Sequence, residues 1–318
     1  MAFELELIKW LQGFRSDFWD FFFQLWTVFG EELVIIGIMG FVYWCYDKKI
    51  GEALGITVFV SLVANSVLKV VFQRPRPFLV DEAIVNIRPQ TAGGYAFPSG
   101  HTQGAATVFG GVAIWLKRRW LTIASAVIIV MVALSRMYLG VHYLTDVVAG
   151  ALLALGIGYG FYFLLNKLDS RGKLYFYTLV GATGLFVASY LYFLFTASAT
   201  SLHNNAANLY ENLEGVAKMM GAIFGFVVGV RFEKRKVDFQ NHRIIWKNLV
   251  RFALGVGIVM AVRILAKALF GLIVDPETLL EGQLGLASLA IMFDFLRYGA
   301  MVFIGIGLYP LAFKKFAV

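Results

Sequence analysis

Apolar runs long enough to cross a lipid bilayer recur along this chain, and they constrain its fold more than any other feature. Hydrophobic residues make up 59% of the 318 residues, charged residues only 15%, and the mean hydropathy is +0.74. A soluble protein of this length needs far less apolar sequence to fill its core. Backbone groups inside a bilayer must be satisfied within the protein, and these runs do not alternate as barrel strands do. The predicted fold is therefore all-α, a polytopic transmembrane helical bundle.

About nine runs approach the roughly 20 residues that a spanning helix needs. They are preceded by residues 1–29, in which charged residues are mixed with Phe, Trp and Leu at helical spacing. This segment is too charged to span, so it is predicted to form an amphipathic helix that lies in the membrane interface. The predicted spans are 30–46, 50–72, 99–116, 120–138, 142–166, 174–196, 213–232, 248–273 and 287–313.

Lysine and arginine concentrate in every second connection between these spans. The connections at 197–212 and 274–286 contain neither residue, whereas the connections on either side of them are rich in both. Basic connections tend to stay in the cytoplasm, which places the N-terminus and the 73–98 and 139–141 connections on the opposite side. The distribution of basic residues among these connections thus accounts for the net charge of +8. The basic residues do not form a surface rich in arginine and aromatic residues, so a nucleic-acid partner is not predicted.

Glycines at four-residue spacing mark faces where two helices can approach closely. Gly221, Gly225 and Gly229 form one such stripe, and Gly156 and Gly160 form another. Stripes of this kind are common in helical bundles, so packing within one chain is favoured over dimerisation.

The first polar cluster lies at the outer end of the 50–72 run, where Lys69 is followed by Arg76 and Pro77. Buried cations near a membrane face are costly unless they meet anions, and a guanidinium fork suits the oxygens of a phosphate. Taken alone, however, this segment favours snorkelling of the two side chains to lipid headgroups.

The second cluster, Ser99-Gly100-His101, opens the 99–116 run, with Ser99 placed as a helix N-cap. A helix N-terminus that carries a glycine and a free hydroxyl offers backbone N–H groups and a positive dipole end to an anion. His101 would point from the first turn toward a bound group. In isolation, a capped helix with an interfacial histidine explains these residues equally well.

The third cluster contains Arg136, His142 and Asp146. His142 and Asp146 are four residues apart at the start of a helix, so they share one face and the carboxylate can hold one ring nitrogen. The other nitrogen is then free to attack. A His–Asp pair at this spacing is more often structural, or half of a metal site, than nucleophilic.

Taken together, the three clusters resemble the three-part signature of the type-2 phosphatidic acid phosphatase superfamily. Every fixed position of that signature is filled, within residues 69–146. The matching residues are Lys69, Arg76, Pro77, Pro98, Ser99, Gly100, His101, Ser135, Arg136, His142 and Asp146.

This resemblance implies a histidine nucleophile. In that family the residue that matches His142 attacks phosphorus and becomes a phosphohistidine, and the residue that matches Asp146 orients it. His101 matches the general acid that protonates the leaving oxygen. The positions that match the phosphate clamp are Lys69, Arg76, Ser99, the Gly100 amide and Arg136.

Neither a metal nor another cofactor is predicted. Three cations already supply the positive charge that a metal would bring to a phosphate. The motifs contain no carboxylate cluster at ligand spacing, and the single Cys45 cannot build a multi-thiolate site.

All three clusters lie at the predicted outer boundary of the membrane, where a lipid can present its phosphate while its tail stays in hydrocarbon. The predicted substrate is a lipid phosphate or diphosphate: undecaprenyl diphosphate, phosphatidic acid, phosphatidylglycerophosphate or a sphingoid-base phosphate. The protein is predicted to be integral to a bacterial plasma membrane with its site on the non-cytoplasmic face, or to an endoplasmic-reticulum membrane with a lumenal site. Its predicted parts are the interfacial helix 1–29, a catalytic core 30–168 and an accessory four-span region 169–318.

Two alternatives are open. A lipid phosphotransferase would pass the phosphoryl group of the same phosphohistidine to another acceptor, and a transporter would use the C-terminal spans to move a polyprenyl lipid. Charges in those spans motivate the transporter, although the sequence resembles neither paired broken helices nor inverted repeats. The charges are Arg263, Lys267, Asp294 and Arg297, which are predicted to pair across helices because unpaired charges in the membrane are costly.

Overall fold

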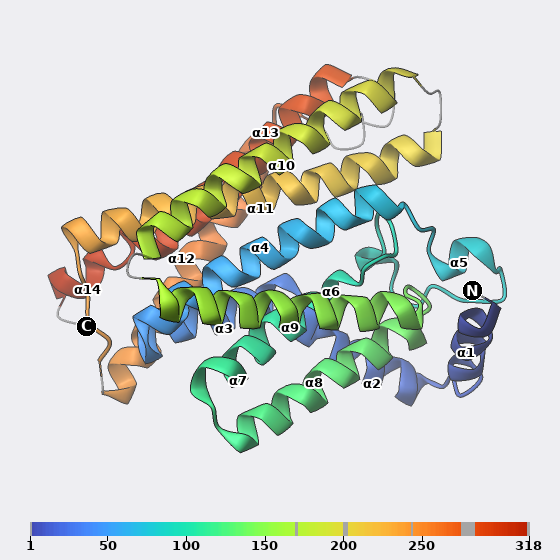
Figure 1. The fold of residues 1–318 in the computed structure, drawn as a ribbon, viewed down its shortest axis with the longest axis horizontal. Helices are drawn as coiled ribbons and strands as arrows, with labels where there is room; N and C mark the ends of the chain where they lie inside the picture. The colour runs from blue at the N-terminus through green and yellow to red at the C-terminus, as the bar shows by residue number, and fades with distance from the viewer. Residues whose placement is uncertain (1, 169–170, 200–202, 243, 275–283, 317–318) are drawn as a thin grey trace. The chain divides into compact units, whose positions relative to one another are not determined.

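The computed structural model describes residues 2–168, 171–199, 203–242, 244–274 and 284–316, and every regular element in these ranges is a helix (Figure 1). This confirms the predicted polytopic helical class. In the described ranges, seven helices are long and apolar enough to cross a membrane, or up to eight if one bent pair forms a single span. That pair, Asp17–Gly30 and Glu32–Tyr46, bends by 48° and includes the predicted span 30–46.

The predicted span 99–116 differs from the others because it is not a continuous α-helix. It consists of α6 (Gly100–Ala105), the π-helical η4 (Ala106–Gly110) and α7 (Gly111–Leu116). A single π-turn inside a helix is frequently found at functional sites. Because of this interruption, the predicted span 99–116 is not among the helices that are long enough to cross a membrane.

Contacts between Cα atoms divide the chain into two compact units. Unit 1 contains Met1–Ile35 and Ala64–Lys167, and unit 2 contains Ile36–Val63 and Leu168–Val318. The three functional parts predicted from the sequence remain a prediction.

Unit 1 begins with two short helices where one amphipathic helix was predicted. The first, α1 (Ala2–Gln12), ends as the Gly13 N–H donates to the Lys9 carbonyl at 2.9 Å. The second, α2 (Asp17–Thr27), starts at Ser16, whose hydroxyl accepts the Trp19 N–H at 3.4 Å. Glycine is a poor helix former, and Gly13 is followed closely by the N-cap Ser16, which together explain the break.

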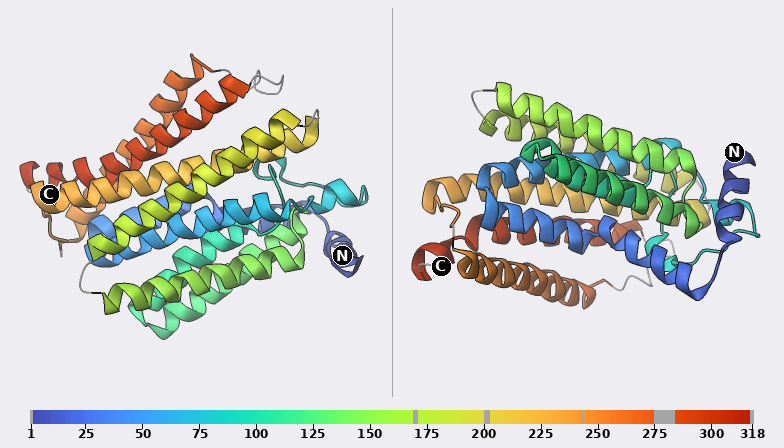
Figure 2. Two further views of the ribbon diagram at one scale, coloured as in Figure 1. Left: turned by 45° about the horizontal axis from the view of Figure 1, so that its top comes forward. Right: turned by 90° about the horizontal axis from the view of Figure 1, so that it is seen from below.

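The remaining elements of unit 1 build the platform for the site. They are η1 (Val28–Gly30), the start of α3 (Glu32–Phe41), the end of α4 (Lys48–Phe72), α5 (Pro77–Val80), η3 (Pro89–Thr91), α6, η4, α7, α8 (Arg119–Tyr138) and α9 (Leu144–Lys167). Both views in Figure 2 show α1 running across the ends of α8 and α9.

Helix α1 is fixed there by apolar packing and by one amide. Ile8 is fully buried and packs in a cluster with Ile84, Met137 and Tyr143. The Gln12 amide donates to the Tyr138 carbonyl at 2.9 Å and to the Val85 carbonyl at 2.8 Å. An amphipathic helix thus covers the end of α8 and the start of α9, which carry the third motif.

Unit 2 consists of the end of α3, η2 (Val42–Tyr46), most of α4, α10 (Arg171–Ala199), α11 (His203–Lys236), α12 (Ile245–Gly271), α13 (Leu284–Phe303), η6 (Ile304–Leu308) and α14 (Leu311–Phe316). The close approach predicted from the first glycine stripe is confirmed between α11 and α13. A Cβ at Gly221 would lie 2.1 Å from the Phe295 carbonyl oxygen, and one at Gly225 would lie 2.2 Å from that of Gly299.

The second glycine stripe does not pack as predicted. A Cβ placed at Gly156 or Gly160 would meet no atom of the described residues within 4 Å. These two residues lie on α9, and the space beside each of them is open. The prediction of a close helix contact at this stripe was therefore wrong.

The charges of the C-terminal spans pair in a different way from the predicted one. Asp294 forms its ion pair with Arg297 on the same helix, α13. Across to α11, Asp294 hydrogen-bonds with Glu214, which in turn pairs with Lys218 at 2.7 Å. The helix that contacts Asp294 from across is thus α11. Lys267 of α12 is exposed.

Candidate active site

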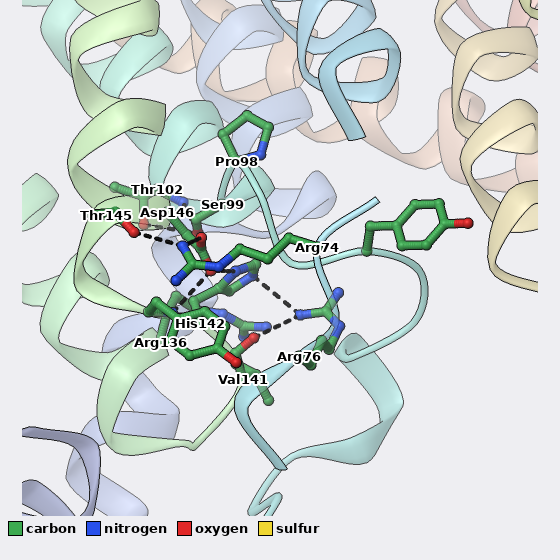
Figure 3. Close-up of polar contacts among 12 residues, drawn as sticks. Arg74, Arg76, Pro98, Ser99, Thr102, Arg136, Val141, His142, Thr145 and Asp146 are labelled. Atoms are coloured by element: carbon green, nitrogen blue, oxygen red, sulfur yellow. Dashed lines mark hydrogen bonds and ion pairs between the residues drawn. The ribbon is translucent and has the colours of Figure 1, made fainter. Parts of the chain in front are cut away.

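Three segments of unit 1 bring the predicted site residues together (Figure 3). The end of α4 and the connection after it carry Lys69 and Arg76, and the start of α6 carries Ser99. The end of α8, the turn after it and the start of α9 carry Arg136, His142 and Asp146. The catalytic and binding roles of these residues remain predictions.

His142 and Asp146 form a buried pair. The His142 Nδ1 atom lies 3.4 Å from Asp146 Oδ2, and the exposed fractions of the two side chains are 2% and 0%. The same Oδ2 accepts the Tyr143 backbone N–H at 2.9 Å. The carboxylate therefore turns toward the imidazole, as the four-residue spacing predicts.

The turn that presents His142 depends on a glycine. Gly140 adopts a φ of +77°, in the region that glycine occupies without steric cost. A Cβ at this position would lie 2.4 Å from the Val85 carbonyl oxygen. The connection between α8 and α9 can therefore be this tight only with glycine at its apex.

The second ring nitrogen of His142 faces the cations. Its Nε2 atom lies 3.3 Å from Arg76 Nη1, which also donates to the Val141 carbonyl at 3.0 Å. His142 lies outside the spanning helices α8 and α9, and burial, followed by the charges of Arg76 and Arg136, lowers its pKa well below 6.5. The imidazole is therefore neutral at neutral pH, which is the state in which a nitrogen can act as a nucleophile.

Three cations of the site donate to backbone carbonyls in one short segment, residues 91–95, which we call the carbonyl segment. Arg76 Nε donates to the Gly94 carbonyl at 3.0 Å, and Arg136 Nη2 donates to the Thr91 carbonyl at 3.0 Å. Arg76 also donates to the Gly93 carbonyl, and Lys69 Nζ donates to the Tyr95 carbonyl. All three cations thus converge on oxygen acceptors in one place.

The predicted N-cap at Ser99 is present. Its hydroxyl accepts the Thr102 N–H at 3.4 Å, and its own N–H donates to the Asp146 carbonyl at 3.0 Å. The second bond joins the start of α6 to the start of α9, and so links the second motif to the third. Gly100 is the first residue of α6, which leaves its N–H at the helix terminus.

His101 is partly buried beside the same cations. Its electrostatic partners include Arg136, Arg76 and Lys69, and it interacts with His142 as well. Its Nε2 atom is buried without a hydrogen-bond partner among the described residues. A buried polar atom of this kind is a natural point of contact for a bound group.

Sequence reasoning missed two charged residues that contact this site, Arg74 and Glu4. Arg74 Nη1 donates to Asp146 Oδ1 at 2.7 Å, and Arg74 Nη2 donates to Glu4 Oε2 at 2.8 Å. Arg74 could have been noticed, because it stands two residues before Arg76 in an extended, proline-containing run. Glu4 gave no such signal, since a first-turn glutamate on an amphipathic helix is usually solvated.

Among the described residues, no group of three or more His, Cys, Asp or Glu side chains is arranged to hold a metal ion. Cys45 is buried in unit 2, where its thiol donates to the Asn248 carbonyl at 3.2 Å.

Comparison with known proteins gives two family matches and several relatives. A model described as the PAP2 superfamily matches residues 51–170, and one described as the PAP2 superfamily phosphatase, transmembrane extension, matches residues 217–318. A lipid A 4'-phosphatase of Bacteroides thetaiotaomicron is 33% identical over 186 residues, which cover 53% of this chain and 79% of that protein. A phosphatidylglycerophosphatase B of Bacillus subtilis is 33% identical over 154 residues, which cover 44% and 69%. The crystal structure of Aquifex aeolicus LpxE aligns with a TM-score of 0.46 and 25% identity, covering 51% of this chain and 96% of that one.

Proposed function

Because this chain belongs to the PAP2 superfamily and is a membrane-integral lipid phosphatase, we propose that it acts through a covalent phosphohistidine on His142. One observation carries the proposal. The neutral imidazole is held by Asp146 on one nitrogen and faces Arg76 with the other, beside two further cations.

In the first step, the His142 Nε2 lone pair attacks phosphorus. A P–N bond forms and the bond from phosphorus to the lipid oxygen breaks. The anionic phosphate offsets the charges of the cations around His101, so this histidine carries a proton when the substrate is bound and gives it to the leaving oxygen. A neutral alcohol or a lipid monophosphate then leaves. Asp146 accepts from the Nδ1 proton throughout and stabilises the positive charge that develops on the ring.

In the second step, water attacks the phosphorus of the phosphohistidine. His101, neutral after the first step, accepts a proton from that water. The P–N bond breaks, inorganic phosphate forms and His142 returns to its neutral state. Two easier displacements thereby replace one difficult hydrolysis.

The clamp assigned to Lys69, Arg76 and Arg136 is supported by the carbonyl segment. Each of these cations already donates to an oxygen atom in residues 91–95. A phosphate carries more charge than a carbonyl and accepts stronger hydrogen bonds, so its non-bridging oxygens are the better partners. The Ser99 hydroxyl and the Gly100 N–H complete the proposed clamp at the start of α6.

The proposed substrates are lipid monophosphates and diphosphates of a bacterial plasma membrane, hydrolysed on the non-cytoplasmic face. Two supports for this assignment are the bacterial relatives and the bias of basic residues toward the opposite connections. The named activities of those relatives make lipid A and phosphatidylglycerophosphate suitable test lipids beside undecaprenyl diphosphate and phosphatidic acid.

The test is phosphate release by the purified protein in detergent, measured across these four lipids without any added acceptor. We expect release of inorganic phosphate from at least one of them. When the reaction is quenched early in alkali, we expect to trap a phosphorylated protein, and this phosphorylation should be lost on treatment with acid. If no inorganic phosphate were released and the phosphoryl group instead appeared on a second lipid added as an acceptor, the protein would be a phosphotransferase. If an early quench trapped no phosphorylated His142, the covalent mechanism would be wrong.

A further inference from the structure

We infer that Arg74 is a positioning residue for the proposed reaction, and that Glu4 of the N-terminal helix holds Arg74 in its place. The inference rests on the proposed roles of His142 and Asp146. It concerns two residues that lie outside the three motifs.

Arg74 lies between two carboxylates and bridges them. Its Nη1 atom donates to Asp146 Oδ1 at 2.7 Å, and its Nη2 atom donates to Glu4 Oε2 at 2.8 Å. Nη1 also donates to the Thr145 hydroxyl at 2.6 Å, and the guanidinium lies 3.7 Å from the centre of the Tyr143 ring. Figure 3 shows Arg74 reaching across to Asp146 and Thr145. Because its two terminal nitrogens contact the two carboxylates and one of its faces lies on the Tyr143 ring, the guanidinium is held in a single position.

The bridge fixes the rotation of the Asp146 carboxylate. Oδ1 is held by Arg74, while Oδ2 is left for the Tyr143 N–H at 2.9 Å and for His142 Nδ1 at 3.4 Å. If Oδ1 lost its partner, the carboxylate could rotate and the imidazole would lose its orientation. Small misplacements of a reacting group are expensive in rate, on the order of 10²-fold for about 1 Å.

Glu4 balances the charge of the bridge. Its Oε1 atom accepts the Thr145 N–H at 2.9 Å and the Thr145 hydroxyl at 2.7 Å, and the residue is 8% exposed. Burial alone would raise the pKa of this carboxyl, but hydrogen bonds from Thr145 and Arg74 outweigh burial and lower it. An ionised Glu4 offsets the Arg74 charge, so the negative charge of Asp146 remains to stabilise a positively charged His142 ring.

The bridge lies on the side of Asp146 away from the nucleophilic nitrogen. His142 Nε2 faces Arg76, whereas Arg74 contacts the carboxylate oxygen that His142 does not use. Arg74 is therefore distinct from the proposed phosphate clamp. Its loss should lower kcat and leave KM nearly unchanged, because ground-state binding of the lipid phosphate stays intact.

The test compares Glu4→Gln and Glu6→Gln in the full-length protein. Glu6 lies on the same helix, pairs with Lys9 and is 71% exposed, so it is a matched control for the loss of one carboxylate from α1. Arg74→Gln and Arg74→Lys complete the set, since lysine keeps the charge and loses the two-ended fork. Phosphate release from phosphatidic acid and undecaprenyl diphosphate is measured, and each variant is first checked for monodisperse elution and its thermal unfolding midpoint.

We expect Glu4→Gln and Arg74→Gln to lower kcat by roughly 10-fold or more with KM within about twofold. Arg74→Lys should recover part of the loss, and Glu6→Gln should match the wild type. Folded Glu4→Gln and Arg74→Gln proteins with wild-type kcat would overturn the inference, as would a change confined to KM. A wild-type protein that hydrolyses none of the four test lipids would count against the proposed function instead, and so against the reaction that Arg74 is inferred to serve.

Discussion

At the residue scale, His142 and His101 are assigned different tasks although both histidines lie near the same cations. Of the two histidines, His142 has Asp146 beside its Nδ1 atom, and this carboxylate defines the orientation of the ring, whereas His101 Nε2 is buried without a partner in the described part of the chain. An imidazole with a fixed orientation, as in His142, suits a nucleophile. A ring nitrogen without a protein partner, as in His101, can donate a proton to the leaving group of a bound substrate.

His142→Ala should therefore abolish turnover, by on the order of 10⁴-fold or more, because no other described side chain takes its position. The protein should remain folded, with the elution profile of the wild type. Phosphate release measures the loss, and labelling quenched in alkali, which preserves the phosphohistidine of the wild type, should detect no phosphorylated protein. Turnover at the wild-type rate would exclude His142 as the nucleophile.

His101→Ala should have an effect that depends on the leaving group. An alkyl oxygen needs a proton to leave, whereas a nitrophenolate does not, so the rate should fall far more for a lipid monophosphate than for p-nitrophenyl phosphate. The comparison uses kcat/KM for the two substrates with wild-type and variant protein. Equal losses for both would remove the general-acid role.

The pH dependence should follow the lowered pKa of His142. Burial and then the Arg76 charge push this pKa well below 6.5, so the imidazole stays neutral, and the enzyme active, as the pH falls to that value. Activity should be lost only at lower pH, when the ring takes up a proton. In Arg76→Gln the ring is easier to protonate, so the acid limb of kcat/KM should move to higher pH, in addition to a lower maximum. An acid limb that stays in place would contradict the Arg76 contribution.

The same shift has a consequence for stability. A histidine with a lowered pKa in the folded state binds its proton more tightly when the chain is unfolded. Its contribution to folding is therefore neutral above about pH 6.5 and unfavourable as the pH falls below that value.

At the element scale, the glycine stripe of α11 determines how closely α13 can approach. Gly225→Ala would place a Cβ 2.2 Å from the Gly299 carbonyl oxygen, which must force the two helices apart. We expect a loss of about 1–3 kcal/mol in the free energy of unfolding, seen as a lower unfolding midpoint in detergent. Gly160→Ala is the control, because a Cβ there meets no atom within 4 Å. Similar midpoints for the two variants would contradict this packing.

The elements also show what the sequence could and could not predict. Hydropathy located the long helices, and fixed motif spacings located His142, Asp146 and the three cations, because both signals are local and periodic. The break between α1 and α2 was not predicted, because the charged and aromatic residues on both sides of it continue at helical spacing. Gly13 and Ser16 nevertheless mark it in the sequence. The contact of Glu4 with Arg74 was not predictable, because it joins residues 70 positions apart through a tertiary fold.

At the scale of the whole molecule, the two family matches follow the chain in order. The superfamily match at 51–170 contains every motif residue, while the transmembrane extension at 217–318 contains none. Every motif residue lies in unit 1, so the proposed chemistry belongs to that unit.

The proposed orientation of the protein in the membrane can be tested by cysteine labelling, because the chain has a single native cysteine that can be replaced. In a Cys45→Ser background, a cysteine in place of Glu82 should react with a membrane-impermeant thiol reagent added to intact cells. A cysteine in place of Arg118 should react only after the cells are opened, because that connection is predicted to be cytoplasmic. Both residues are exposed in the structure, so access to the reagent depends on the side of the membrane. The reverse pattern would place the site in the cytoplasm.

The carbonyl segment bears on how the product leaves. Lys69, Arg76 and Arg136 each have an oxygen partner in residues 91–95 before any phosphate arrives, so binding exchanges one set of partners for another. An exchange yields less net affinity than filling an empty charged pocket, because the carbonyls must first be given up. A lipid adds the affinity of its tail for the bilayer, whereas inorganic phosphate has only the clamp. In the proposed reaction, the returning carbonyls would therefore compete with the product, and accumulated phosphate would inhibit the enzyme weakly.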